Sequence, residues 1–220
     1  MAVLDLQEQE QLEAFKGWWR ENRIQILGAL LIVVVVLGGW RGWQYFQGKQ
    51  TSEAAILYAE FSSQLESNDV QRINDAAAAM MDKFASTAYA SRAALLAAQV
   101  NEHRQVNQQQ KDFTRAKTQL QWVIAHGSEA SLKDVARLRL AAILLDEKNY
   151  TEAMQLLETP HPSTFDGLYA DLKGDVLSAQ GNNDEARVAY QLAIDKTDVK
   201  SMYRNLVQLK LDALTGIAAK

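Results

Sequence analysis

Three histidines, His103, His126 and His161, are the side chains of this sequence best suited to acid–base or metal chemistry near neutral pH. No two of them have the spacing that brings imidazoles onto one metal ion. The motifs of zinc peptidases, serine hydrolases, P-loop proteins and dinucleotide-binding proteins do not occur. The chain has no cysteine, which excludes thiol catalysis and disulfides. The sequence therefore predicts no metal and no cofactor.

Carboxylates offer the other route to general acid–base chemistry. Asp171 and Asp175 lie one helical turn apart, and Asp134 and Arg137 are spaced in the same way. Charged residues on a helix exterior most often form solvated pairs, so both are predicted to be surface pairs. The sequence indicates a protein that is not an enzyme.

The elements that would carry these side chains are helices. Pro160 and Pro162 are the only prolines, alanine and leucine are abundant, and no β-type alternation continues after residue 47. The fold class is predicted to be all-α.

A short polar segment ending in alanine occurs three times in the second half of the chain. The copies are Lys111–Ala116, Lys148–Ala153 and Gly181–Ala186. The first two start 37 residues apart and the last two 33. In each copy an Asn or Asp at the second position suits a turn, and a Thr or Asp at the fourth position is expected to cap the next helix. Repeats of this length indicate stacked helix pairs.

The pattern resembles the tetratricopeptide repeat, in which small and large residues alternate where two helices meet. The residues that form this repeat signature are Ala116, Ala153, Gly174, Ala186 and Tyr190. The resemblance implies an α-solenoid over residues 47–220, with a groove that suits an extended peptide or a partner helix. Other expected elements are helices over Glu53–Glu66 and Val70–Phe84, an extended loop over His103–Gln110 and a capping helix over Val199–Ile217.

A run of 17 uncharged residues, Ile24–Trp40, precedes the repeats. Extended to Phe46, it is long enough to cross a bilayer as a single transmembrane signal anchor over residues 24–46. A buried core helix and a cleaved signal peptide are the alternatives; the four-valine run argues against the first and the long apolar stretch against the second. The residues expected to anchor at the two interfaces are Leu12, Phe15, Trp18, Trp19, Trp40, Arg41 and Trp43.

Three glycines, Gly28, Gly38 and Gly42, leave flat places on this helix where another membrane helix could pack. Basic residues are slightly more numerous before the apolar run than just after it. This bias favours a cytoplasmic tail over residues 1–23 and a translocated domain beyond the anchor. The net charge is −4 and the two signs are mixed along the chain, so the sequence does not predict a basic surface that binds nucleic acid.

Four stretches carry a further resemblance, which covers nearly the whole chain. They are Glu10–Asn22, Gly39–Trp43, Leu138–Ala141 and Ala170–Asp175. The chain resembles the YfgM family of ancillary subunits of the bacterial SecYEG translocon. The resemblance implies a single-pass inner-membrane protein with a cytoplasmic N-terminus and a periplasmic repeat domain. It also implies three kinds of partner: the translocon, a PpiD-like periplasmic chaperone and translocating polypeptides.

The expected function is a scaffold that helps pass translocated proteins to periplasmic chaperones. Two alternatives stay open. The repeats could serve another envelope complex, or the cytoplasmic tail, residues 1–23, could act in stress signalling.

Overall fold

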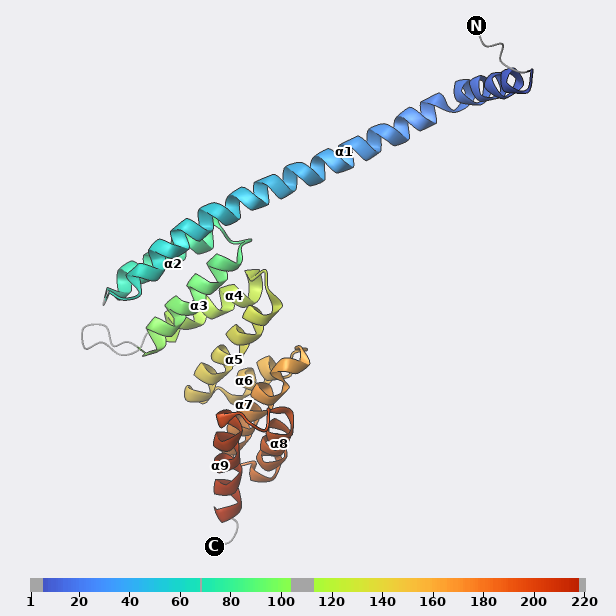
Figure 1. Ribbon diagram of the computed structural model, residues 1–220. Helices are drawn as coiled ribbons and strands as arrows, with labels where there is room; N and C mark the ends of the chain where they lie inside the picture. Colours follow the sequence, from blue (N-terminus) through green and yellow to red (C-terminus); the bar gives the residue numbers. More distant parts are fainter. Residues whose placement is uncertain (1–5, 68, 104–112, 218–220) are drawn as a thin grey trace. The chain divides into compact units, whose positions relative to one another are not determined.

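The computed structural model describes residues 6–67, 69–103 and 113–217, and these form helices joined by short turns. The helices are α1 (Leu6–Gln64), α2 (Val70–Lys83), α3 (Ala88–His103), α4 (Phe113–His126), α5 (Ala130–Asp146), α6 (Tyr150–Leu157), α7 (Asp166–Ala179), α8 (Asn183–Lys196) and α9 (Met202–Ile217), with a 3-10 turn, η1 (Ser163–Phe165), before α7 (Figure 1). The predicted all-α fold is confirmed.

The chain divides into two compact units, Met1–Gln50 and Thr51–Lys220. The described part of the first unit is a helix whose side chains from Leu27 to Leu37 are all exposed. It is the one helix in the described ranges that is long and apolar enough to cross a membrane. The separate helix expected from Glu53 does not occur, because α1 continues to Gln64. No proline interrupts residues 47–52, so nothing in that segment ends the helix.

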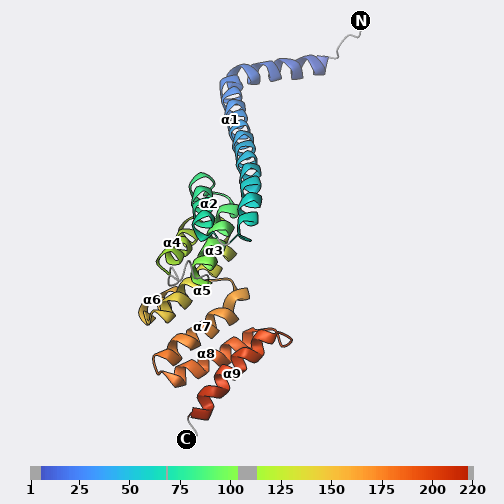
Figure 2. The same ribbon diagram turned by 90° about the vertical axis from the view of Figure 1, so that its left-hand side faces the viewer.

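The second unit is a stack of helices. From α2 to α9 each helix packs against the next along the chain, and α3 with α5 and α5 with α7 also touch (Figures 1 and 2). Three apolar clusters form the core, the first between the end of α1, α2 and α3, the second from α3 to α7, and the third between α7, α8 and α9. This order of packing is that of a helical-repeat solenoid.

The turns from α5 to α6 and from α7 to α8 share one geometry. Lys148 and Gly181, at φ 62° and 85°, end α5 and α7 in the left-handed region. The next residue donates its N–H to a carbonyl in the last turn, Asn149 to Leu144 at 2.8 Å and Asn182 to Leu177 at 2.9 Å. These are Schellman motifs, and they satisfy carbonyls that the helix end leaves unpaired.

This geometry corrects one prediction. Thr151 and Asp184 were expected to cap the new helices, but α6 and α8 already begin at Tyr150 and Asn183. In these two copies the left-handed residue reverses the chain so early that the fourth position lies inside the first helical turn. The loop expected over His103–Gln110 and the start of the first copy at Lys111 fall mostly at residues 104–112, outside the described residues.

Candidate interaction sites

A cluster of charged and hydroxyl side chains joins α7, α8 and α9, and we call it the charge cluster. Lys210 Nζ lies 2.9 Å from both carboxylate oxygens of Asp171 and 2.7 Å from Asp175 Oδ2. Tyr203 donates to Asp171 Oδ2 at 2.5 Å, and Tyr190 donates to Asp175 Oδ1 at 2.7 Å. All four carboxylate oxygens therefore accept a hydrogen bond from the fold itself.

The charge cluster overturns the prediction of a surface pair, because Asp171 is buried at 5% exposure. Burial and the neighbouring carboxylates raise the pKa of both Tyr190 and Tyr203. Burial alone would lower the pKa of Lys210, but its hydrogen bonds to Asp175 and Asp171 outweigh burial and raise it. Each group is held in the protonation state that binds its partner, so the charge cluster stabilises the packing of α7, α8 and α9.

Asp134 is the second buried carboxylate, with 1% of its surface exposed. Arg137 donates to its Oδ1 at 2.6 Å and the Tyr169 hydroxyl donates at 3.1 Å. The ring of His161 stacks on Tyr169 with centroids 3.8 Å apart. The predicted surface pair is again wrong, because α5 and α7 bury it between them. Burial, followed by the charge of Asp134, raises the pKa of Tyr169 to about 12.

A triangle of amides lies between α2, α3 and α4. Asn101 donates to Asn74 Oδ1 at 2.9 Å and to Gln119 Oε1 at 2.9 Å, while Gln119 donates to Asn74 Oδ1 at 2.8 Å. All three residues are buried. The sequence analysis did not predict this triangle. The signal that could have indicated it is one polar residue on each of α2, α3 and α4 at a position that helical periodicity assigns to the interior.

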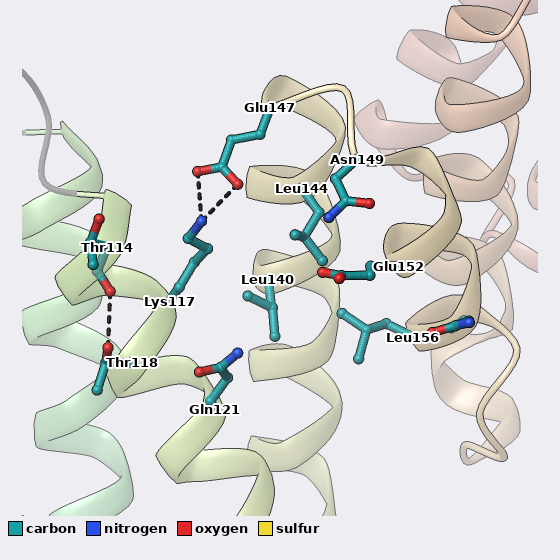
Figure 3. Close-up of a pocket in the computed structure, with 11 residues that line it drawn as sticks. Thr114, Lys117, Thr118, Gln121, Leu140, Leu144, Glu147, Asn149, Glu152 and Leu156 are labelled. Atoms are coloured by element: carbon teal, nitrogen blue, oxygen red, sulfur yellow. Dashed lines mark hydrogen bonds and ion pairs between the residues drawn. The ribbon is translucent and has the colours of Figure 1, made fainter.

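An open pocket of about 430 Å³ lies between α4, α5 and α6, and we call it the α4–α6 pocket (Figure 3). Its apolar lining comes from Leu140, Leu144 and Leu156. Lys117 and Glu147 form an ion pair of 2.7 Å at one edge. The lining also includes Thr114, Thr118, Gln121, Asn149, Glu152 and Gln155.

Three side-chain amides of the α4–α6 pocket, those of Gln121, Asn149 and Gln155, have no hydrogen-bond partner among the described residues. Each can donate to one polar group and accept from another. An apolar lining with unpaired amides around it suits a polypeptide, whose backbone presents both kinds of group. A second pocket, between α2 and α4, shares Thr114 and Thr118 with the first, so the two form neighbouring hollows along α4.

The repeat-signature residues all lie in the interior. Ala116, Ala153 and Ala186 have no exposed surface, Tyr190 is 3% exposed, and Gly174 is buried against the Tyr190 ring. They pack helices together and line none of the pockets described above.

The residues expected at the membrane interfaces are exposed along α1. Phe15 and Trp18 have ring centroids 6.0 Å apart, and Trp40 and Trp43 5.9 Å apart. A Cβ added at Gly28, Gly38 or Gly42 would meet nothing within 4 Å. His103 ends α3, His126 ends α4, and His161 lies between α6 and η1. In the described ranges, no group of three or more histidines and carboxylates could hold a metal ion.

The stacked helix pairs, the left-handed turns between them and the buried small residues define a helical-repeat protein. A family model described as a tetratricopeptide repeat-like domain matches residues 16–216, and the chain belongs to this family. No solved structure matches it.

Curated relatives extend this assignment over nearly the whole chain. Proteins named "Ancillary SecYEG translocon subunit" from Neisseria gonorrhoeae and Escherichia coli K12 are 29% and 28% identical to it over 210 and 211 residues. These matches cover 95% and 94% of this chain, and 98% and 97% of the relatives. A protein of the same name from Haemophilus influenzae is 26% identical over 213 residues. The resemblance to the YfgM family is thereby confirmed.

Proposed function

We propose that this protein is a membrane-anchored scaffold at the bacterial SecYEG translocon. In this proposal α1 crosses the inner membrane once, residues 1–23 are cytoplasmic and the repeat domain is periplasmic. The repeat domain binds a PpiD-like chaperone and helps pass translocated proteins to it. The observation that carries the proposal is the exposed apolar helix joined to a repeat domain, in a chain that relatives named as translocon subunits match over about 95% of its length.

The anchor supports a tethering mechanism. A domain held at the membrane stays within a short distance of the translocon exit, so its effective concentration there is high. Weak contacts are then sufficient, which fits an open pocket with a few unpaired amides better than a deep, closed cavity would.

The distribution of charge supports the proposed orientation. Lys16, Arg20 and Arg23 precede the apolar run closely, whereas Arg41 and Lys49 follow it. Basic residues near a membrane helix favour the cytoplasmic side. The domain beyond the anchor is long, and long domains are translocated largely regardless of their charge.

The test is purification of the tagged full-length chain from membranes in a mild detergent, with mass spectrometry of what accompanies it. A parallel chain has residues 24–46 replaced by an unrelated membrane anchor. We expect translocon subunits and a PpiD-like chaperone with the natural chain. Loss of the translocon from the second sample would place that contact in the anchor, and its retention would place it in the repeats.

Absence of translocon subunits from both samples would overturn the proposal. Partners from another envelope machine would then favour a different scaffold with the same fold. The signalling alternative has its own test, because it requires that deletion of the tail, residues 1–23, abolish regulation while a foreign anchor with an intact tail preserves it.

A further inference from the structure

Two pockets of the solenoid occupy equivalent places in the repeat. One is the α4–α6 pocket, and the other is an open pocket of about 620 Å³ between α8 and α9, which we call the α8–α9 pocket. Aligning the signature residues Ala116 and Ala186 superposes the parts of α4 and α8 that line them. The equivalent lining residues are Lys117 with Arg187, Thr118 with Val188, and Gln121 with Gln191. The same place in the repeat is therefore hollowed twice, two repeats apart.

Both pockets have an aliphatic floor. In the α4–α6 pocket the floor is Leu140, Leu144 and Leu156. In the α8–α9 pocket it is Val188, Leu192 and Leu211. None of the described residues that line the two pockets is aromatic. A floor of this kind packs well against the methylene groups of a long side chain whose charged end stays in water.

The α4–α6 pocket contains a carboxylate without a cation. Its lysine, Lys117, is already paired with Glu147 at 2.7 Å. Glu152, by contrast, has no ion-pair partner among the described residues. Figure 3 shows that its carboxylate points from α6 into the pocket. The lining therefore has an unbalanced negative charge beside an aliphatic surface.

The α8–α9 pocket has the same imbalance. Its arginine, Arg187, is paired with Asp184, which does not line the pocket. Asp195 does line it, and within the described ranges its carboxylate accepts a hydrogen bond from the neutral Gln191 amide at 3.0 Å but has no ion-pair partner. Both pockets thus combine an aliphatic floor with a carboxylate that lacks a cation.

We propose that each pocket receives a lysine side chain of the chaperone to which the repeat domain binds, an inference that rests on the proposed function. One ammonium group lies beside Glu152 and the other beside Asp195, while the methylene groups cover the two floors. An ammonium group has three donors. In the α4–α6 pocket the amide oxygens of Asn149 and Gln155 supply further acceptors.

The chemistry of the linings selects this occupant. A net negative lining attracts a cation and disfavours an anion. An arginine gains over a lysine mainly where its planar guanidinium can stack or form paired bonds, and neither pocket offers a ring for stacking. A lysine needs only a point charge of opposite sign.

The repetition of the pocket favours a folded chaperone over a polypeptide that is still unfolded. The solenoid holds the two pockets at a fixed separation. A folded partner holds two lysines at a fixed separation as well, so it loses less conformational entropy when it fills both. Two weak contacts on one partner also reinforce each other.

Zero-length crosslinking tests the contact directly. The natural full-length chain is treated in membranes with a carbodiimide, which joins a carboxylate to an amine in direct contact as an amide, and the joined peptides are identified by mass spectrometry. We expect crosslinks from Glu152 and from Asp195 to lysines of the chaperone. Glu158 and Glu185 are exposed carboxylates outside both pockets and should give none.

Paired variants supply a second measurement. An exposed ion pair changes binding by about 2- to 3-fold, so Glu152→Gln with Asp195→Asn should lower recovery of the chaperone by about 4- to 9-fold. Glu158→Gln with Glu185→Gln removes the same charge from outside the pockets and should leave recovery unchanged. Circular dichroism of both double variants should match that of the natural chain.

The outcomes separate this inference from the proposed function. Failure of the natural chain to recover a chaperone would overturn both. A chaperone that is recovered, but without either one of the two expected crosslinks, would overturn the inference alone. Equal recovery by the two double variants would do the same, and so would crosslinks from the pockets to translocating polypeptides in place of the chaperone.

Discussion

The ring of Tyr190 occupies the space in which a side chain at Gly174 would begin. A Cβ at position 174 would lie 2.5 Å from Tyr190 Cε1, closer than real side-chain contacts. The same Tyr190 donates its hydroxyl to Asp175, so the ring cannot move aside without breaking a bond of the charge cluster. One residue, Tyr190, thus fixes both the spacing of α7 and α8 and the position of the half-buried Asp175 carboxylate.

This relationship predicts that Gly174→Ala lowers the free energy of unfolding by about 1–3 kcal/mol, because it overpacks a tight contact. The measurement is denaturation of the full chain in detergent, followed by circular dichroism. In a Tyr190→Leu background the same change should cost much less, since the obstructing ring is gone. Equal costs in the two backgrounds would show that the ring is not the obstacle.

Lys210→Met should destabilise the protein by about 2–4 kcal/mol, because it leaves Asp171 and Asp175 without their cation. Thermal denaturation compares this variant with Lys196→Met. The Lys196 side chain is 49% exposed and 3.2 Å from Asp166, so breaking that pair should cost less than about 1 kcal/mol. A similar cost for both variants would mean that burial adds nothing to the charge cluster.

The amide triangle predicts a loss of about 2–3 kcal/mol for Asn101→Ala, because buried Gln119 Oε1 loses its donor and Asn74 loses its bonds to Asn101. Asn205→Ala, an exposed asparagine on α9, is the matched control and should have little effect. Replacing all three amides by leucine or methionine should cost less than the three single changes added together. A simple sum would argue that the amides contribute independently.

The raised pKa of Tyr169 predicts that the protein loses stability at alkaline pH. Its folded pKa is raised from 10.0 to about 12, so the unfolded chain releases the phenolic proton first. The stabilisation is therefore fully present below about pH 10 and is lost as the pH rises through 12, by about 3 kcal/mol. Tyr169→Phe should flatten the fall in unfolding free energy between pH 10 and 12.

The control for this pH series is Tyr150→Phe, since the Tyr150 hydroxyl has no hydrogen-bond partner within the described ranges. It should leave the alkaline slope unchanged. An unchanged slope in Tyr169→Phe as well would mean that other groups cause the loss.

The α4–α6 pocket predicts a functional effect. Gln155→Arg should fill the pocket and remove one hydrogen-bonding amide, so that recovery of the chaperone with the tagged protein falls by about 3-fold or more. Gln180→Arg places the same charge on an exposed residue of the α7–α8 turn and should leave recovery unchanged. Quantitative mass spectrometry of the two purifications measures the chaperone recovered with each variant. Equal recovery would show that the α4–α6 pocket does not bind the chaperone.

The helices and their order could be predicted because their signals are local. Periodicity, the near absence of proline and the repeated turns are all written in short stretches of sequence. The burial of Asp171 could not be predicted in this way. It depends on Lys210, 39 residues further along, and on the approach of α9 to α7. The spacing of residues along α7 carries no information about contacts with α9. On spacing alone, a carboxylate is therefore assigned to the exposed side of its helix.

The candidate pocket lay beyond sequence reasoning for the same reason. Gln121 and Gln155 are ordinary exposed helix residues in the sequence, and only the stacking of α4, α5 and α6 brings them around one hollow. The exposed apolar residues of α9, Met202, Leu206 and Leu209, are a contrasting case, because their spacing is visible in the sequence. The sequence does not show that the solenoid packs against a different face of α9, the one with Val207 and Leu214.

The neighbour-to-neighbour packing of α2 to α9 has a consequence for how the domain acquires its structure. Packed helices are adjacent along the chain or one element apart, so few contacts span a long loop. Low contact order favours rapid folding. Each helix pair can settle as soon as the helix that covers it has been made, without waiting for the C-terminus. In the proposed topology the domain crosses the membrane from its N-terminal end, so it would fold in that order, and α9, which is bonded to α7 through Lys210 and Asp171, would pack last.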